Sequence, residues 1–183
     1  MSNDFDIQLL AIDLDGTLLN SNRVIPEANI KAIHDAKEAG IRVAICTGRP
    51  FRSMKFVIDE LDMHDDEDLV CTYNGGMILR SKTGEILHEE THSKEDAVLM
   101  KKVADQLHLP VNMVDFEKIY EPPYPLNAPS VYQIERKLIY NDDSLLFQNI
   151  IVEEMPEDWR FNKMVMARPQ QELDEALLRM PKY

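Results

Sequence analysis

The stretch Leu10-Ala11-Ile12-Asp13-Leu14-Asp15-Gly16-Thr17-Leu18-Leu19 is the most informative segment of this chain. The apolar run from Ile7 to Ile12 predicts a fully buried strand of a parallel sheet. It ends on Asp13 and Asp15, and because side chains alternate along a strand, the two carboxylates point the same way. Converging carboxylates are costly unless a positive charge lies between them, so the segment predicts a site for a hard divalent cation, most simply Mg²⁺. The alternative is an Asx-type turn that only closes the strand.

The first 80 residues alternate strand-like apolar runs with helix-like amphipathic segments. Further strands are predicted over 41–46 and 69–73, and helices are predicted over about 26–39 and 50–61. Short links between such elements indicate a doubly wound parallel α/β sheet with right-handed crossovers. Ligands of such sheets bind at the carboxyl ends of the strands.

Polar residues follow the second and third predicted strands. Thr47 and Gly48 lie near the start of a predicted helix, where a hydroxyl, backbone amides and the helix N-terminus indicate a phosphate-binding corner. Arg49 either reaches the substrate or only pairs with a surface carboxylate. Asn74 opens an Asn-Gly-Gly run, which makes a tight turn into a hairpin and is also expected to line the crevice at the strand ends.

Composition limits the partners that suit this chain of 183 residues. It carries 33 acidic and 20 basic residues, a formal charge of −13, which argues against nucleic acid and anionic membrane surfaces. No apolar stretch approaches the roughly 20 residues needed to cross a bilayer. Its two cysteines, Cys46 and Cys71, lie in apolar runs and indicate a reducing cytoplasm rather than a disulfide framework. An anionic substrate would be attracted by local positive groups and a metal.

The segment Asp13–Leu18 matches without a substitution the D-x-D-G-T-L/V motif of the haloacid dehalogenase superfamily. The Thr47-Gly48-Arg49 run resembles the second motif of that superfamily. The segment 72–76 (T-Y-N-G-G) resembles the N-G-(A/G) motif found at this point in its Cof-type branch. The resemblance implies a three-layer, Rossmann-like core and a Mg²⁺-dependent phosphatase of small phosphorylated metabolites, such as sugar phosphates, acting through an aspartyl-phosphate.

The same resemblance implies a role for each motif residue. Asp13 would be the nucleophile and Asp15 the general acid and base, and both would contact the metal. The phosphate and substrate contacts would come from Gly16, Thr47, Gly48, Arg49 and Asn74.

Residues beyond the third predicted strand indicate a hairpin and then an α+β module. We expect a hairpin over 77–88, strands over 111–116, 119–120 and 161–167, a proline-rich surface loop over 122–129, and helices from Ser93, over 130–138 and over 169–180. The acidic string 138–143 is expected to be a loop rather than a second site. Because Cof-type relatives insert a substrate-selecting cap here, the resemblance implies a core over 1–88 and a cap over 89–183.

Two elements of the family's phosphatases are not found in the sequence. One is a lysine that bridges nucleophile and phosphate, and the other is a G-D-x-x-N-D-type segment that supplies another metal ligand. We therefore expect a core that is incomplete, with the chain truncated within the cap. A second copy of the chain would then cover the exposed sheet edges as a homo-oligomer. The alternative function is a catalytically impaired homologue that only binds metal or phosphate or self-associates.

Overall fold

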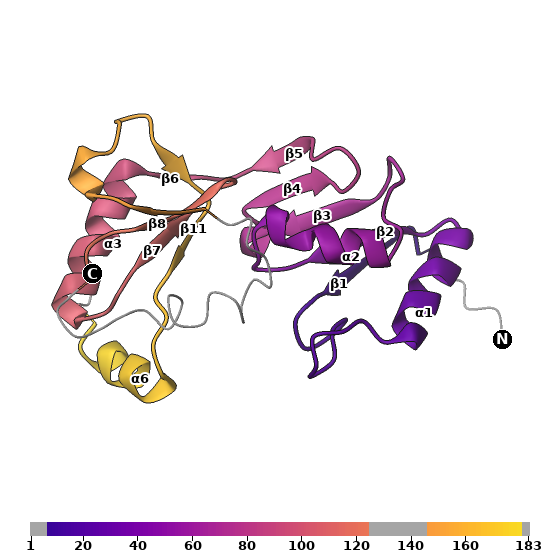
Figure 1. Ribbon diagram of the computed structural model, residues 1–183, viewed down its shortest axis with the longest axis horizontal. Coiled ribbons are helices and arrows are strands. Elements are labelled where there is room, and N and C mark those ends of the chain that lie inside the picture. Colours follow the sequence, from indigo (N-terminus) through magenta and orange to yellow (C-terminus); the bar gives the residue numbers. More distant parts are fainter. Residues whose placement is uncertain (1–6, 125–145, 181–183) are drawn as a thin grey trace. The chain divides into compact units, whose positions relative to one another are not determined.

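The computed structural model describes residues 7–124 and 146–180 of the chain (Figure 1). It divides into two compact units, unit 1 over Met1–Glu90 and unit 2 over Thr91–Tyr183. Unit 1 contains a five-stranded sheet with the strand order β1-β2-β3-β4-β5, and unit 2 contains a four-stranded sheet with the order β11-β7-β8-β9.

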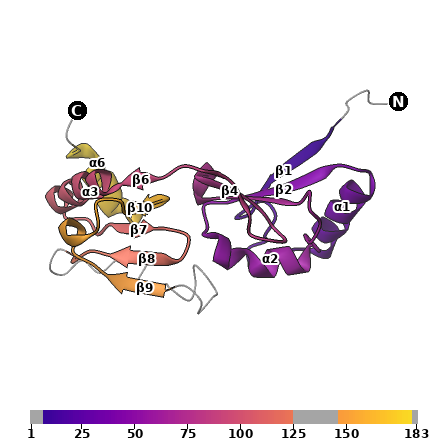
Figure 2. The same ribbon diagram turned by 90° about the horizontal axis from the view of Figure 1, so that it is seen from above.

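The predicted alternation of strands and helices is confirmed in unit 1. The elements are β1 (Leu9–Asp13), α1 (Glu27–Glu38), β2 (Arg42–Cys46), the 3-10 turn η1 (Phe51–Met54), α2 (Lys55–Glu60) and β3 (Leu69–Thr72). The three strands pair in parallel, as expected for an α/β sheet. Because both crossovers step in the same direction along the sheet, α1 and α2 cover the same face of it (Figure 2).

The core of unit 1 lies between that face and the two helices. Val43, Ile45 and Val70 point from β2 and β3 into one buried cluster with Ile33 of α1 and Val57 of α2. Full burial of each such side chain contributes about 1.5–3 kcal/mol to stability. This packing holds the carboxyl ends of β1, β2 and β3 beside one another.

The prediction that the first strand is fully buried is wrong. Ile7 is 58% exposed and Leu9 is 48% exposed, whereas Leu10 and Ile12 pack against the core. The reason is that β1 is the edge strand of the sheet and, within the described residues, pairs only with β2. One of its faces meets the helices and the other is open, so its side chains alternate between the two environments.

The predicted hairpin is confirmed and extends the same sheet. It consists of β4 (Met77–Arg80) and β5 (Ile86–Glu89), and β4 pairs antiparallel with β3. A short 3-10 turn, η2 (Tyr73–Gly75), links β3 to β4. The sheet is therefore parallel over its first three strands and antiparallel over its last two.

The first helix of unit 2 is the predicted one, α3 (Lys94–Leu107), whose N-cap is Ser93. Ser93 and Asp96 form a complete capping box, as the sequence pattern predicts. The other elements are β6 (His92–Ser93), β7 (Asn112–Val114), β8 (Lys118–Glu121), β9 (Leu146–Asn149), η3 (Val152–Glu154), β10 (Arg160–Phe161), β11 (Lys163–Val165) and α6 (Gln170–Leu178).

Two features of unit 2 differ from the sequence-based expectation. The single strand expected over 161–167 is two short strands, because β10 pairs with β6 while β11 pairs with β7. The strand β9 was not predicted, and it pairs in parallel with β8. The helix expected over 130–138, the acidic string 138–143 and most of the proline-rich loop over 122–129 lie outside the described residues.

An aromatic cluster forms the core of unit 2. Trp159 packs edge-on against Tyr120 and lies 5.1 Å from the ring of Phe161. Ala97 and Ala104 of α3 contact this cluster, where their small side chains allow the helix to approach the sheet. None of the described helices is long and apolar enough to cross a membrane.

Candidate active site

The two motif carboxylates lie at the carboxyl end of β1 and both are exposed. Asp13 is the last residue of β1, and Asp15 follows after Leu14, which is completely buried in the core. The Leu14 amide donates to the Cys46 carbonyl at 3.1 Å, so the chain stays attached to β2 beyond the end of the strand. The buried leucine therefore anchors a short segment that presents both acids to solvent.

A tight turn follows and returns to the core. Gly16 has a φ of +83°, a left-handed conformation that other residues adopt at a cost. The amide of Leu18 donates to the Asp13 carbonyl at 3.2 Å, and the side chain of Leu18 is buried. The Thr17 hydroxyl donates to Oδ2 of Asp13 at 3.3 Å. This contact orients the Asp13 carboxylate. The sequence analysis assigned Thr17 no role, although its position four residues after Asp13, in the turn that follows β1, could have indicated one.

Arg49 binds the Asp15 carboxylate through two nitrogens. Its Nε lies 2.9 Å from Oδ2 and its Nη2 lies 2.5 Å from Oδ1. The Arg49 side chain is only 10% exposed, whereas that of Asp15 is 54% exposed. Of the two alternatives for Arg49, the structure shows pairing with a carboxylate, and that carboxylate is the expected acid and base. A bidentate guanidinium contact fixes both the position and the plane of the carboxylate.

Thr47 joins the segments that follow β2 and β3. Its buried hydroxyl oxygen accepts from the Arg49 amide at 3.1 Å, which leaves the hydroxyl hydrogen available as a donor. The Thr47 amide donates to the Cys71 carbonyl at 2.8 Å, and its carbonyl accepts from the Asn74 amide at 3.1 Å. Asp15, Arg49, Thr47 and Asn74 therefore form one hydrogen-bonded chain across three strand ends.

Asn74 lies on an exposed, strained turn. Tyr73 has a φ of +54° and Asn74 has a φ of +60°, and both precede Gly75 at +99°. Asparagine tolerates this left-handed region, but a bulky tyrosine rarely adopts it. Backbone strain of this kind is most common at functional sites.

Gly48 is half-buried between Thr47 and Arg49. The helical segment expected to begin at Pro50 starts as the 3-10 turn η1 at Phe51, so Thr47 and Gly48 precede it rather than form its first turn. The structure thus places Thr47, Gly48 and Arg49 on the link between β2 and η1.

The acidic groups of the site fit a metal only in part. Within 7–124 and 146–180, no three His, Cys, Asp or Glu residues are grouped so that they could hold a metal ion. The carboxylate of Asp13 is exposed and contacts Thr17, and that of Asp15 is held by Arg49. Mg²⁺ in proteins commonly takes one or two carboxylates and completes its shell with water and phosphate. Asp13 fits that description.

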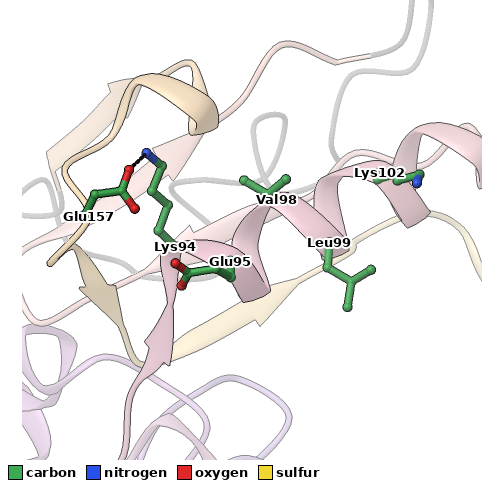
Figure 3. Close-up of a pocket in the computed structure, with 6 residues that line it drawn as sticks. All are labelled: Lys94, Glu95, Val98, Leu99, Lys102 and Glu157. Atoms are coloured by element: carbon green, nitrogen blue, oxygen red, sulfur yellow. Dashed lines mark hydrogen bonds and ion pairs between the residues drawn. The ribbon is translucent and has the colours of Figure 1, made fainter.

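A hollow outside this region lies beside α3. It has a volume of about 370 Å³ and is lined by Lys94, Glu95, Val98, Leu99, Lys102 and Glu157 (Figure 3). The ammonium of Lys94 pairs with Glu157 at 2.7 Å across one end of it. None of the residues predicted for the active site lines this hollow.

Comparison with known proteins identifies the family. The haloacid dehalogenase-like hydrolases match residues 10–183. The chain belongs to this family. The family resemblance that the Asp13–Leu18 motif indicated is therefore confirmed, and the motif lies at the strand end described above.

Three relatives illustrate the similarity. The putative phosphatase YxeH of Bacillus subtilis (strain 168) is 29% identical over 175 residues, which cover 96% of this chain and 63% of the relative. The 5-amino-6-(5-phospho-D-ribitylamino)uracil phosphatase YwtE of the same organism is 42% identical over 101 residues, 55% of this chain and 32% of the relative. The crystal structure of a haloacid dehalogenase-like hydrolase from Bacteroides thetaiotaomicron superposes with a TM-score of 0.72 at 22% identity, over 94% of this chain and 62% of that one.

The structural match confirms the α/β fold with its parallel sheet strands. The chain spans less than two thirds of the length of these relatives.

Proposed function

We propose that this chain carries the nucleophile-bearing part of a metal-dependent phosphatase that hydrolyses phosphate monoesters of small metabolites. The observation that carries the proposal is the pair of exposed carboxylates at the end of β1, with Asp15 held by the nearly buried side chain of Arg49. The family and its phosphatase relatives support the same reaction class.

The proposed reaction has two steps, with Asp13 and Asp15 in different roles. An oxygen of Asp13 attacks phosphorus and forms an aspartyl-phosphate, while Asp15 gives a proton to the leaving oxygen. Asp15 then takes a proton from the water that hydrolyses the intermediate. Bound Mg²⁺ would reduce the repulsion between the nucleophile and the phosphate. Its proposed protein ligands are Asp13 and Asp15, with Asp15 using a lone pair that its contact with Arg49 leaves open.

The surrounding groups would bind the substrate. The free hydroxyl hydrogen of Thr47 and the amides of Gly16 and Gly48 are proposed donors to the phosphoryl oxygens. Arg49 orients Asp15 through its bidentate contact, and we propose that it lies beside the bound phosphate. Asn74 is exposed at the neighbouring strand end, and we propose that it contacts the substrate beyond the phosphate.

We propose sugar-phosphate-like compounds as the substrate class. A relative that is 42% identical over 101 residues is named for a substrate with a phosphorylated ribityl group. In this proposal the part over 1–88 supplies the chemistry, and the part over 89–183 is the cap that selects the substrate.

We also propose a cytoplasmic location and self-association. Two cysteines without a disulfide support a reducing compartment. The exposed Leu9 and the edge strand β1 support pairing with a second copy, because an unpaired edge is a template for another strand.

One observation favours a second candidate function. No group of three or more potential metal ligands occurs among the described residues. Weak metal binding would lower the rate of hydrolysis more than it would lower the affinity for phosphate. A homologue that binds metal or phosphate without hydrolysis is therefore the alternative.

Phosphatase assays of the 183-residue chain separate the two candidates. Hydrolysis of p-nitrophenyl phosphate and a panel of sugar phosphates is measured with and without Mg²⁺, for the wild type and for Asp13→Asn. A matched control is Asp35→Asn, which removes an exposed carboxylate on α1. We expect Mg²⁺-dependent hydrolysis that only Asp13→Asn abolishes. Equal rates for all three proteins would reject the enzyme.

A further inference from the structure

The two cysteines of the chain are register partners on neighbouring strands. Cys46 ends β2 and is paired with Cys71 of β3 in a parallel ladder. Register partners point to the same face of a sheet, so both thiols lie on one face. The spacing of neighbouring strands, about 4.8 Å, falls within the range of about 4.4–6.8 Å that a disulfide spans between Cα atoms.

The two side chains are also neighbours and accessible. Burial and the neighbouring Cys71 raise the pKa of the Cys46 thiol. Both residues are half-buried rather than enclosed, and neither is part of a disulfide. A small oxidant can therefore reach both thiols, and the spacing of their Cα atoms is within the range of a disulfide. The raised pKa of Cys46 slows its attack on the oxidant, because the thiolate is the nucleophile.

We propose that Cys46 and Cys71 are a redox-active pair that closes reversibly to an intramolecular disulfide. With hydrogen peroxide as the oxidant, one thiol sulfur attacks a peroxide oxygen and becomes a sulfenic acid, which releases the first water. The second sulfur attacks the sulfenic sulfur, the S–S bond forms and a second water leaves. The two thiols together lose two electrons and two protons. A dithiol reductant reverses the reaction by exchange.

The pair is joined directly to the proposed catalytic segments. Cys46 has a register partner on each neighbouring strand, Cys71 on β3 and Asp13 on β1. The Cys46 carbonyl accepts from the Leu14 amide, and the Cys71 carbonyl accepts from the Thr47 amide at 2.8 Å. Closing a disulfide requires the Cβ atoms to approach to about 3.8 Å, which moves the backbone carrying these bonds.

We therefore expect oxidation to lower phosphatase activity by about tenfold or more, since small displacements of positioning groups have effects of that size. This effect on activity rests on the proposed function, whereas formation of the disulfide does not.

The test is oxidation of the whole chain with a small excess of hydrogen peroxide, followed by peptide mapping without reduction. The chain has 10 methionines that also take up oxygen, so the readout is the peptide that links residues 46 and 71 rather than the intact mass. We expect this linked peptide, loss of both titratable thiols in the unfolded protein, and recovery of both with dithiothreitol. Cys46→Ser and Cys71→Ser are the matched variants, and neither can form the linked peptide.

Other outcomes would overturn the inference. Sulfinic or sulfonic acids at residues 46 and 71, or disulfide-linked dimers without the internal peptide, would show that the thiols do not pair. A linked peptide with unchanged phosphatase activity would reject the coupling to the active site. A reduced protein without phosphatase activity would reject the proposed function, while the linked peptide would still establish the redox pair.

Discussion

Arg49 holds both carboxylate oxygens of Asp15, although 34 positions separate the two residues in the sequence. The guanidinium is almost buried and the carboxylate is half-exposed. A rigid donor fork therefore fixes the one acid that, in the proposed reaction, must point at the leaving oxygen.

Replacing Arg49 tests this positioning role. We expect Arg49→Lys to lower kcat/KM by about tenfold to a hundredfold, because a lysine supplies charge but cannot hold both carboxylate oxygens at once. The loss should be in kcat more than in KM if Arg49 mainly orients Asp15. Arg52→Lys, at an exposed position on η1, is the matched control. A lysine variant with wild-type kcat would show that bidentate orientation is unimportant.

Asp15→Asn tests the proton-transfer role. We expect turnover of an alkyl phosphate to fall by about 10²–10⁴-fold, the usual contribution of a positioned acid or base. The loss should be smaller for p-nitrophenyl phosphate in the first step, because that leaving group needs little protonation. Rapid-quench measurement of phosphoenzyme separates the two steps. Equal losses for both substrates in the first step would contradict the assignment of Asp15 as the acid.

Two leucines, one in β1 and one directly after it, test how burial determines the contribution of a side chain to stability. Leu14 is fully buried, and we expect Leu14→Ala to lower the free energy of unfolding by about 2–5 kcal/mol. Leu9 is 48% exposed on the open face of the edge strand, and Leu9→Ala should cost less than about 1 kcal/mol. Urea denaturation measures both values. A large effect at Leu9 in a protein shown to be monomeric would indicate that this face is covered.

The capping box of α3 predicts a pH dependence. Hydrogen bonds from the Ser93 backbone amide and hydroxyl lower the pKa of Asp96 below its ordinary value. A lowered pKa means that the folded state favours the carboxylate, so Asp96 stabilises the fold above its ordinary pKa and loses this contribution as pH falls through the lowered value.

The measurement is urea denaturation between about pH 7 and pH 2, for the wild type and for Asp96→Asn. We expect the stability difference between the two proteins to shrink as the solution is acidified below about pH 4. Ser93→Ala should cost about 1 kcal/mol at neutral pH through loss of the cap, and Ser21→Ala, at an exposed turn, is the control. A difference that stays constant with pH would contradict the role of Asp96.

The sequence predicted most of unit 1, since its signals are local. Hydrophobic periodicity located α1, β2 and β3 to within a few residues. It failed at the first strand, where the apolar run gave no sign that β1 is an edge strand with one open face. It also missed β9 and the division of β10 from β11, because short strands are defined by their pairing partners rather than by their own residues.

The sequence by itself determined the family and the identity of the candidate acids, because a short motif combines a strand, two carboxylates and a turn in consecutive residues. Only the tertiary structure decided that Arg49 pairs with the Asp15 carboxylate. It also decided that Thr47 links the segments after β2 and β3, and that Cys46 is the register partner of Cys71. These partners come from different strands. Their contacts depend on the parallel register that the core imposes, and no local pattern of residues specifies that register.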